Sequence, residues 1–346
     1  MRVTIPELSL VLLIGPSGSG KSTFAARHFR PTEVLSLDAV RRMIADDDTD
    51  EGATEAAWGA LLELAARRMS WGHLTVIDAD LETAARRPPL LQLAEEQNYI
   101  SVAFFFGAGA FDGEGFRRAF RFATPQEVAA VEILRLPLWC NRKDESGPFD
   151  IIGAVNGRYE ELVDLLKELG YRTTPEIAHP GGRKLVFLGD LADGGPGDTN
   201  IFRLVMSAVD GGVSYSVPGD CDTPYAGNTE FRSFLKDSVS HYVFDKGGLV
   251  VAHAGMKESL QGRGSAAVRD FALHGDGTSS QSAPKWVLEY QGAARVVYSH
   301  PTITDPLWLN QTVNLATEGH FTALRYPEMQ IVSVAVSNRI SYAARN

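Results

Sequence analysis

The stretch LSLVLLIGPSGSGKS, residues 8–22, joins an apolar run of strand length to a glycine-rich loop that ends in lysine and serine. The loop fits the pattern G-x-x-x-x-G-K-[ST], which binds nucleotide phosphates when a strand precedes it and a helix follows. Its glycines let backbone N–H groups converge on phosphate oxygens, and the helix N-terminus adds partial positive charge. We therefore predict a site for ATP or GTP with Mg²⁺. The predicted nucleotide-binding residues are Gly15, Ser17, Gly18, Ser19, Gly20, Lys21, Ser22 and Thr23.

Phosphoryl transfer also needs a group that activates the acceptor and groups that compensate charge. Lys21 is predicted to bridge the β- and γ-phosphates, and Ser22 is predicted to ligate Mg²⁺. Asp38 ends the next apolar run and is the predicted base toward an attacking hydroxyl, with Arg41 one turn later to hold the acceptor. Asp78 ends the third apolar run and is predicted to complete the magnesium shell.

Each of these residues also has a purely structural alternative. A glycine-rich turn can exist without a nucleotide. An aspartate at a strand end often caps the next helix, as Asp38 and Asp78 could do. Arg41 could be a solvated charge on a helix face.

Strands and helices alternate through the first half of the chain. Such alternation is typical of a parallel α/β sheet with right-handed crossovers. Residues 107–115, GAGAFDGEG, are predicted to form a loop, because four glycines in nine residues disfavour both helix and strand. The predicted strands are residues 8–14, 34–37, 73–78 and 100–106, and the predicted helices are residues 23–29, 40–45, 54–69 and 90–96.

The second half begins after a polar segment at residues 141–148, NRKDESGP, which indicates a boundary between domains at residues 1–145 and 146–346. A strand at residues 149–152 and a helix at residues 159–169 precede four β-rich runs. Each run delivers an Asp or His near its C-terminal end. Because open sheets bind ligands outside the carboxyl ends of their strands, a polar site is predicted along one sheet edge. The runs are LVFLGD (185–190), SYSVPGD (214–220), GLVVAHAG (248–255) and ARVVYSH (294–300).

The 346-residue chain has an ordinary composition, with 33 basic and 43 acidic residues and a net charge of −10. This acidic excess disfavours nonspecific binding along a long polyanion. No apolar run approaches the ~18 residues that a bilayer span needs, and the N-terminal run is interpreted as a core strand. We therefore expect a cytoplasmic protein with no membrane partner. Cys140 and Cys221 are too few for a disulfide framework and too far apart for a thiol metal motif.

Several motifs together resemble the bacterial polynucleotide kinase–phosphatases of RNA end repair, over nearly the whole chain. The resemblance implies an α/β protein with a P-loop NTPase kinase domain followed by a calcineurin-like metallophosphoesterase domain, an α/β sandwich. In that family the first domain moves an NTP γ-phosphate to a 5′-hydroxyl, and the second is binuclear. The family's ligase module has no counterpart in this sequence. The matching segments are LIGPSGSGKSTFAARHF, PTEVLSLD, PLWCNRK…GPFDIIG, KLVFLGDLADGGP, VPGDCD, VVAHAG and TALRYP.

The kinase motifs of that family are intact except for the lid. The family has an arginine-rich lid helix where this chain has the shorter residues 107–120, and Arg117, Arg118 and Arg121 do not align with lid arginines. Lid arginines stabilise transition-state charge, so the truncation favours a small nucleoside-type acceptor over long RNA. The resemblance assigns phosphate binding to Gly18, Gly20, Lys21 and Ser22, the acceptor base to Asp38 and an acceptor contact to Arg41.

The phosphatase motifs are altered at several positions. The first, G-D-x-H-G, reads GAVNG at residues 153–157, where an alanine offers no ligand to a hard divalent cation. The second keeps Asp190 and Asp193 but has Gly194 in place of a phosphate-gripping arginine. The third, G-N-H-D, reads GDCD at residues 219–222, so the acid–base histidine is missing.

The surviving ligands predict an incomplete metal centre. One metal would keep Asp190 and His300, and the other would keep Asp190, Asp220 and His253. Two-metal hydrolysis needs both ions ~3.5–4 Å apart. We therefore predict a pseudo-phosphatase whose vestigial site retains Mn²⁺ at most, and whose scaffold serves folding, substrate shape or assembly into a homo-oligomer.

Three functions stay open at this point. The first is a kinase that transfers the γ-phosphate of an NTP to a hydroxyl of a nucleoside, a nucleotide or a polynucleotide 5′ end, with the small acceptor favoured. The second is a non-catalytic nucleotide-binding regulatory or assembly protein. The third is a manganese-dependent phosphatase with a rebuilt one-metal site of Asp190, Asp220, His253 and His300.

Overall fold

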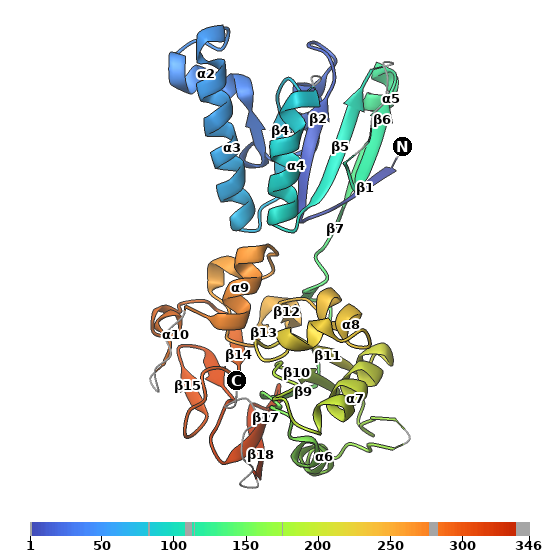
Figure 1. The fold of residues 1–346 in the computed structure, drawn as a ribbon, viewed down its shortest axis with the longest axis vertical. Coiled ribbons are helices and arrows are strands. Elements are labelled where there is room, and N and C mark those ends of the chain that lie inside the picture. Colours follow the sequence, from blue (N-terminus) through green and yellow to red (C-terminus); the bar gives the residue numbers. More distant parts are fainter. Residues whose placement is uncertain are drawn as a thin grey trace. The chain divides into compact units, whose positions relative to one another are not determined.

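A computed structural model describes residues 2–81, 84–107, 113, 115–174, 176–276 and 283–336. The chain divides into two compact units, Met1–Leu138 with Arg263–Val268, and Trp139–Gly262 with Arg269–Asn346 (Figure 1). The first unit therefore ends before residue 145 and takes in a short segment from later in the chain. Among the described residues, none of the helices combines the length and the apolar character of a membrane span.

The first unit is built on a five-stranded parallel sheet in the order β3-β4-β2-β5-β6. The central strand β2 (Ser9–Ile14) is buried at all six residues. Because its side chains alternate between faces, Leu10 packs in one core with Leu61, whereas Val11 packs in another with Phe24. A parallel sheet covered on both faces needs such an apolar central strand. The other elements are β3 (Val34–Ser36), β4 (Thr75–Asp78), β5 (Ile100–Phe106), β6 (Arg118–Phe122), α1 (Lys21–His28), α2 (Leu37–Ala45), α3 (Thr54–Ser70), α4 (Arg87–Glu96), α5 (Pro125–Ala129), and the separate parallel pair β1 (Arg2–Pro6) and β7 (Glu132–Leu136).

The chain leaves β3 earlier than the sequence predicts. β3 ends at Ser36, whose Oγ accepts a hydrogen bond of 3.4 Å from the Ala39 amide and caps α2. A serine in that position satisfies a helix N–H that otherwise has no partner. Asp38 therefore lies in the first turn of α2, and the prediction that it ends a strand is wrong.

The second unit is a sandwich of two sheets, one in the order β11-β10-β9-β17-β18 and one in the order β15-β16-β14-β13-β12-β8. Phe149 and Val186 of the first sheet share a core with Val251 and Val297 of the second, so the inner faces pack together. Helices α6 and α7 pack on the opposite face of the first sheet. The elements are β8 (Asn141–Arg142), β9 (Phe149–Ile152), β10 (Lys184–Phe187), β11 (Ser214–Ser216), β12 (His241–Phe244), β13 (Leu249–Ala252), β14 (Arg295–Tyr298), β15 (Leu307–Leu309), β16 (Thr312–Asn314), β17 (His320–Tyr326), β18 (Gln330–Ala335), α6 (Tyr159–Glu168), α7 (Asp198–Asp210), α8 (Arg232–Asp237), α9 (Ala266–His274) and α10 (Lys285–Glu289).

Four strands of this sandwich deliver polar side chains at their carboxyl ends. Asp190 follows β10 and Asp220 follows β11 in one sheet, while His253 follows β13 and His300 follows β14 in the other. The predicted β-rich runs are therefore strands, and their polar ends meet where the two sheets approach each other.

Candidate functional site

The loop between β2 and α1 has the backbone of a phosphate cradle. Gly15 has a φ of 154°, and a Cβ there would lie 2.5 Å from the carbonyl oxygen of Phe106, so a side chain does not fit. Gly18 and Gly20 have φ values of 75° and 94°, which side chains rarely adopt, and a Cβ on either would meet no atom within 4 Å. The loop is thus packed against the sheet at Gly15 and open at the two glycines nearest α1.

Lys21 closes back over this loop. Its Nζ donates hydrogen bonds to the carbonyl oxygens of Gly15 at 2.6 Å and Pro16 at 2.9 Å. Ser19 Oγ is buried and has no hydrogen-bond partner in the described part of the chain. An ammonium group at the helix N-terminus and an unsatisfied buried hydroxyl both fit the oxygens of a triphosphate.

Asp78 lies beside this cradle. β4 ends at Asp78, which pairs in register with Leu13 of β2 on one side and with Ser36 of β3 on the other. Asp78 is buried. Parallel strands end at the same edge of a sheet, so Asp78 lies at the edge where the phosphate loop begins. Its carboxylate and the hydroxyl of Ser22, in the first turn of α1, are the groups that could hold Mg²⁺ at this edge.

Arg41 is fixed in place and is not a solvated helix-face charge. Its side chain is 15% exposed, its Nη1 donates to Asp38 Oδ1 at 3.1 Å, and the same nitrogen donates to the Asp48 carbonyl. Asp38 itself is 72% exposed at its side chain, so its carboxylate is accessible to an acceptor. These two hydrogen bonds give the Arg41 side chain a defined orientation on the surface that carries Asp38.

The lid region can be described only in part. The predicted loop at residues 107–115 lies outside the described residues except for Gly107, Gly113 and Gly115. β6 begins at Arg118, whose guanidinium donates to the Thr4 carbonyl at 2.8 Å, and Arg121 Nε donates to the Gly107 carbonyl at 3.4 Å. Both arginines therefore bind backbone of their own unit.

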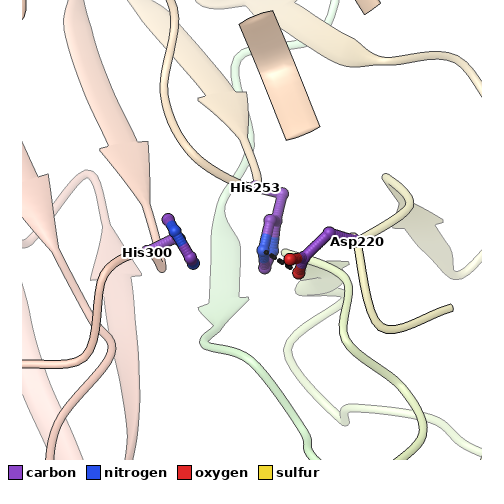
Figure 2. A group of neighbouring side chains, drawn as sticks. All are labelled: Asp220, His253 and His300. Atoms are coloured by element: carbon purple, nitrogen blue, oxygen red, sulfur yellow. Dashed lines mark ion pairs between the residues drawn. The ribbon is translucent and has the colours of Figure 1, made fainter. Parts of the chain in front are cut away.

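The second unit brings Asp220, His253 and His300 together (Figure 2). One ligand atom from each lies within 4.8 Å of the others. His253 Nδ1 donates to the Leu188 carbonyl at 2.8 Å, which turns Nε2 toward the centre. Nε2 lies 3.4 Å from Asp220 Oδ1 and 3.5 Å from Asp190 Oδ2, which is ion-pair distance from both, although neither contact has hydrogen-bond geometry. A buried ring nitrogen aimed between two carboxylates fits a divalent cation.

Electrostatics at this centre follow from burying acids beside an imidazole. Burial alone would lower the pKa of His253, but Asp190 and Asp220 outweigh burial and raise that pKa to about 9. His253 in turn holds the pKa of Asp220 low, whereas burial raises the pKa of Asp190. Burial and the charge of His253 both lower the pKa of His300. The proton on His253 compensates the carboxylates, and a metal ion would provide the same compensation.

Glycines set the close approach of the two acidic loops. A Cβ on Gly219 would lie 2.0 Å from Asp190 Oδ1, and a Cβ on Gly189 would lie 2.3 Å from the Gly219 amide nitrogen. The Cys221 amide donates to Asp190 Oδ1 and to Asp220 Oδ1, each at 3.1 Å. This contact fixes both carboxylates relative to each other.

Asp222, in contrast, is committed to the backbone. Its Oδ1 accepts from the amides of Leu191 at 2.7 Å and Ala192 at 3.3 Å, and its Oδ2 accepts from Gly219 at 2.9 Å. Burial and the nearby charge of Asp190 raise the pKa of Asp222 to about 7. Asp222 therefore holds the two loops together and is not available as a ligand.

The first phosphatase motif has no charged side chain at its second position. Ala154 is buried, and its amide donates to Ser299 Oγ at 2.7 Å. Asn156 has a φ of 48° and bonds the Ala154 carbonyl through Nδ2 at 3.4 Å. The backbone path of the motif persists, but a methyl group stands where a carboxylate ligand is expected.

The structure brings the predicted ligands Asp190, Asp220 and His253 together and places His300 beside Asp220 and His253. The predicted first metal has Asp190 and His300 as ligands, whereas in the structure His300 lies in one group with Asp220 and His253. A second group contains Asp190, Asp220 and Cys221, again with ligand atoms within 4.8 Å of one another. The sequence did not lead us to predict Cys221 as a ligand. The wide separation of Cys140 and Cys221 argues against a site made only of thiols, but it says nothing about a site that mixes one thiol with carboxylates. The position of Cys221 inside the GDCD motif was the signal for such a mixed site.

Comparisons with known proteins agree with this two-part organisation. Residues 10–130 match a family model described as an AAA domain. The bis(5′-nucleosyl)-tetraphosphatase PrpE (asymmetrical) of Anoxybacillus flavithermus is 35% identical over 228 residues, covering 54% of this chain and 93% of the relative. Its namesake in Bacillus cereus strain Q1 is 33% identical over 232 residues, covering 55% and 94%. A crystal structure provisionally described as a diadenosine tetraphosphatase is 20% identical and covers 58% of this chain and 98% of its own, with a TM-score of 0.46.

Fold and sites together define a protein with a kinase-like P-loop domain and a metallophosphoesterase-like domain. The chain belongs to the family of the PrpE bis(5′-nucleosyl)-tetraphosphatases.

Proposed function

We propose that this protein is an NTP-dependent phosphotransferase that moves a γ-phosphate to a hydroxyl of a nucleoside, a nucleotide or a polynucleotide 5′ end. The observation that carries the proposal is the cradle between β2 and α1, with open space at Gly18 and Gly20 and the Lys21 ammonium folded over the loop. The match of residues 10–130 to an AAA domain supports nucleotide binding by the same segment.

Each residue of the cradle would have a defined task. Lys21 would neutralise the β- and γ-phosphates, and Ser22 with Asp78 would hold the Mg²⁺ that supplies further charge compensation. The exposed carboxylate of Asp38 would accept the proton of the attacking hydroxyl. Arg41, held by Asp38 and the Asp48 carbonyl, would position the acceptor.

We further propose a small nucleoside-type acceptor in the cytoplasm. The shortened segment at residues 107–120 and the net charge of −10 both disfavour a long polyanion as substrate. The resemblance to polynucleotide kinase–phosphatases makes a nucleic-acid 5′-hydroxyl the acceptor to be compared.

To test the proposal, the protein is incubated with ATP or GTP and with nucleosides, nucleotides or short RNAs as acceptors. Mass spectrometry then detects the phosphorylated product. Asp38→Asn removes the proposed base and should lower turnover by about 10²- to 10⁴-fold with an unchanged KM for NTP. Asp46→Asn, at the exposed C-cap of the same helix, is the matched control because Asn tolerates the left-handed φ of 56° there.

Full turnover by Asp38→Asn would show that the assigned base is wrong. NTP binding without transfer to any acceptor would instead support a regulatory or assembly protein.

A metal-dependent phosphatase in the second unit is the second candidate, favoured by the buried Nε2 of His253 between the carboxylates of Asp190 and Asp220. The relatives are named as tetraphosphatases, which makes a bis(5′-nucleosyl) tetraphosphate the substrate to test. The alanine at position 154 favours a pseudo-phosphatase instead. Manganese-dependent hydrolysis that is lost in His253→Ala would establish the phosphatase.

A further inference from the structure

The loop that follows β11 carries a thiol into the group of acidic ligands. Cys221 Sγ and one oxygen each of Asp190 and Asp220 lie within 4.8 Å of one another. The Cys221 amide is tied to both carboxylates at 3.1 Å, so the backbone that bears the thiol is fixed relative to the acids.

A separate observation points to a cation at the same place. His253 is fully buried, and its Nε2 lies within ion-pair distance of Asp190 and Asp220, at 3.5 and 3.4 Å, without hydrogen-bond geometry to any described residue. An imidazole nitrogen held in this way by its Nδ1 bond to the Leu188 carbonyl is oriented as metal ligands are.

The donor set determines which cation fits. Carboxylates and imidazoles alone serve Mg²⁺ and Mn²⁺, but a thiolate is a soft ligand that favours zinc over hard cations. Zn²⁺ accepts sulfur, nitrogen and oxygen donors together in a four-coordinate site. Asp190, Asp220 and Cys221 supply one sulfur and carboxylate oxygens, and His253 Nε2 lies 3.5 and 3.4 Å from the two carboxylates.

We propose that the second unit binds a single zinc-class cation with Cys221 Sγ as a ligand beside Asp190 and Asp220. Binding breaks the S–H bond of Cys221, forms a metal–sulfur bond and releases the proton to solvent. The absence of a carboxylate at Ala154 leaves this ion without the partner ion of a binuclear centre. This cation would be the metal of the phosphatase site proposed in the second unit. Its binding does not depend on whether the first unit transfers phosphate.

Cobalt(II) reports directly on thiolate coordination. The full-length chain is freed of metal with a chelator and titrated with Co²⁺, and a thiolate-to-cobalt charge-transfer band in the near ultraviolet is expected. Zn²⁺ should abolish the band by displacing Co²⁺, whereas an equal concentration of Mn²⁺ should not. Because the readout is spectroscopic, loss of hydrolysis would leave it unaffected.

Cys221→Ser keeps the side-chain size and removes the soft donor. The variant should lose the band and bind Zn²⁺ at least about tenfold more weakly, since even outer-shell changes cost metal sites about 10- to 100-fold. Cys140→Ser is the matched control, because Cys140 is buried near the start of the unit and contributes to neither ligand group. This control should keep the band.

A third measurement uses the unaltered chain and does not require a variant to fold. Zn²⁺ should slow alkylation of Cys221 by iodoacetamide, followed peptide by peptide in a mass spectrometer with Cys140 as internal reference. The proposal is overturned if Co²⁺ binds without the band, if no Co²⁺ binds, or if Zn²⁺ leaves the alkylation of Cys221 unchanged.

Discussion

The Nζ of Lys21 lies 2.6 Å from the carbonyl oxygen of Gly15, so the ammonium group is already held over the loop that is expected to receive phosphate. Lys21 is also the only lysine among residues 1–138. Within the loop at residues 15–22 Lys21 is the only charged residue, so the charge that the loop itself offers to a triphosphate comes from this side chain and from backbone amides.

Removing that charge should slow phosphate transfer strongly. Lys21→Met should lower turnover by about 10²- to 10³-fold, as the loss of one group that stabilises transition-state charge commonly does. The folded state should persist by circular dichroism, because the two bonds of Lys21 go to loop carbonyls and not to the core. Lys236→Met, at an exposed position of α8 in the second unit, should retain full activity. Equal rates for both variants would contradict the role of Lys21.

The single lysine also permits a labelling experiment without mutation. An amine-reactive acetylating reagent can modify only Lys21 among the side chains of residues 1–138. NTP with Mg²⁺ should slow this modification about tenfold or more, because phosphate oxygens would occupy the ammonium donors. Peptide mass spectrometry measures the rate, and Lys236 provides the reference within the same sample. Unchanged labelling at saturating NTP would mean that the nucleotide binds elsewhere.

Gly219→Ala should damage the second unit. The added Cβ would lie 2.0 Å from Asp190 Oδ1 and 2.2 Å from the Asp190 amide nitrogen, and backbone atoms cannot give way as a flexible side chain can. We expect the free energy of unfolding to fall by about 1–3 kcal/mol or more, and cation binding to weaken because the carboxylate is displaced. Gly227→Ala is the control, since its Cβ would meet no atom within 4 Å and should change stability by less than about 0.5 kcal/mol. Equal unfolding midpoints for the two variants would argue against the close packing of these loops.

His241 should make the second unit less stable in acid. His241 is fully buried, its Nε2 accepts from the Gly262 amide at 2.9 Å, and burial lowers its pKa to about 4. Between about pH 6.5 and pH 4 the unfolded chain binds the proton and the folded chain does not, so stability falls as pH falls through this window. The loss from this group approaches about 3 kcal/mol and levels off below about pH 4.

Denaturant titrations at several pH values test this linkage. His241→Gln should show a shallower decline between pH 7 and pH 5 than the unaltered chain, because it removes the titrating group. His320→Gln, at an exposed position that begins β17, should leave the decline unchanged. If His241→Gln keeps the full slope, the pH dependence arises from other groups.

Much of the first unit could be predicted because its signals are local. The apolar run before Gly15 is β2, and β4 ends at Asp78 as the sequence predicts. The end of β3 could not be placed, because the choice between strand and helix at Leu37 depends on the hydrogen bond from the Ala39 amide to Ser36 Oγ. Whether Arg41 is solvated was equally undecided, since that depends on the later loop that brings in the Asp48 carbonyl.

The sequence by itself determined that the chain carries a phosphate loop between a strand and a helix, and that four later strands end in acids or histidines. Such patterns arise from the spacing of neighbouring residues, which the chain order fixes before folding. Only the tertiary structure decided that His300 lies with Asp220 and His253, and that Cys221 lies with Asp190. Those distances depend on how two sheets pack and how closely glycine loops approach, and this packing joins residues that lie far apart along the chain.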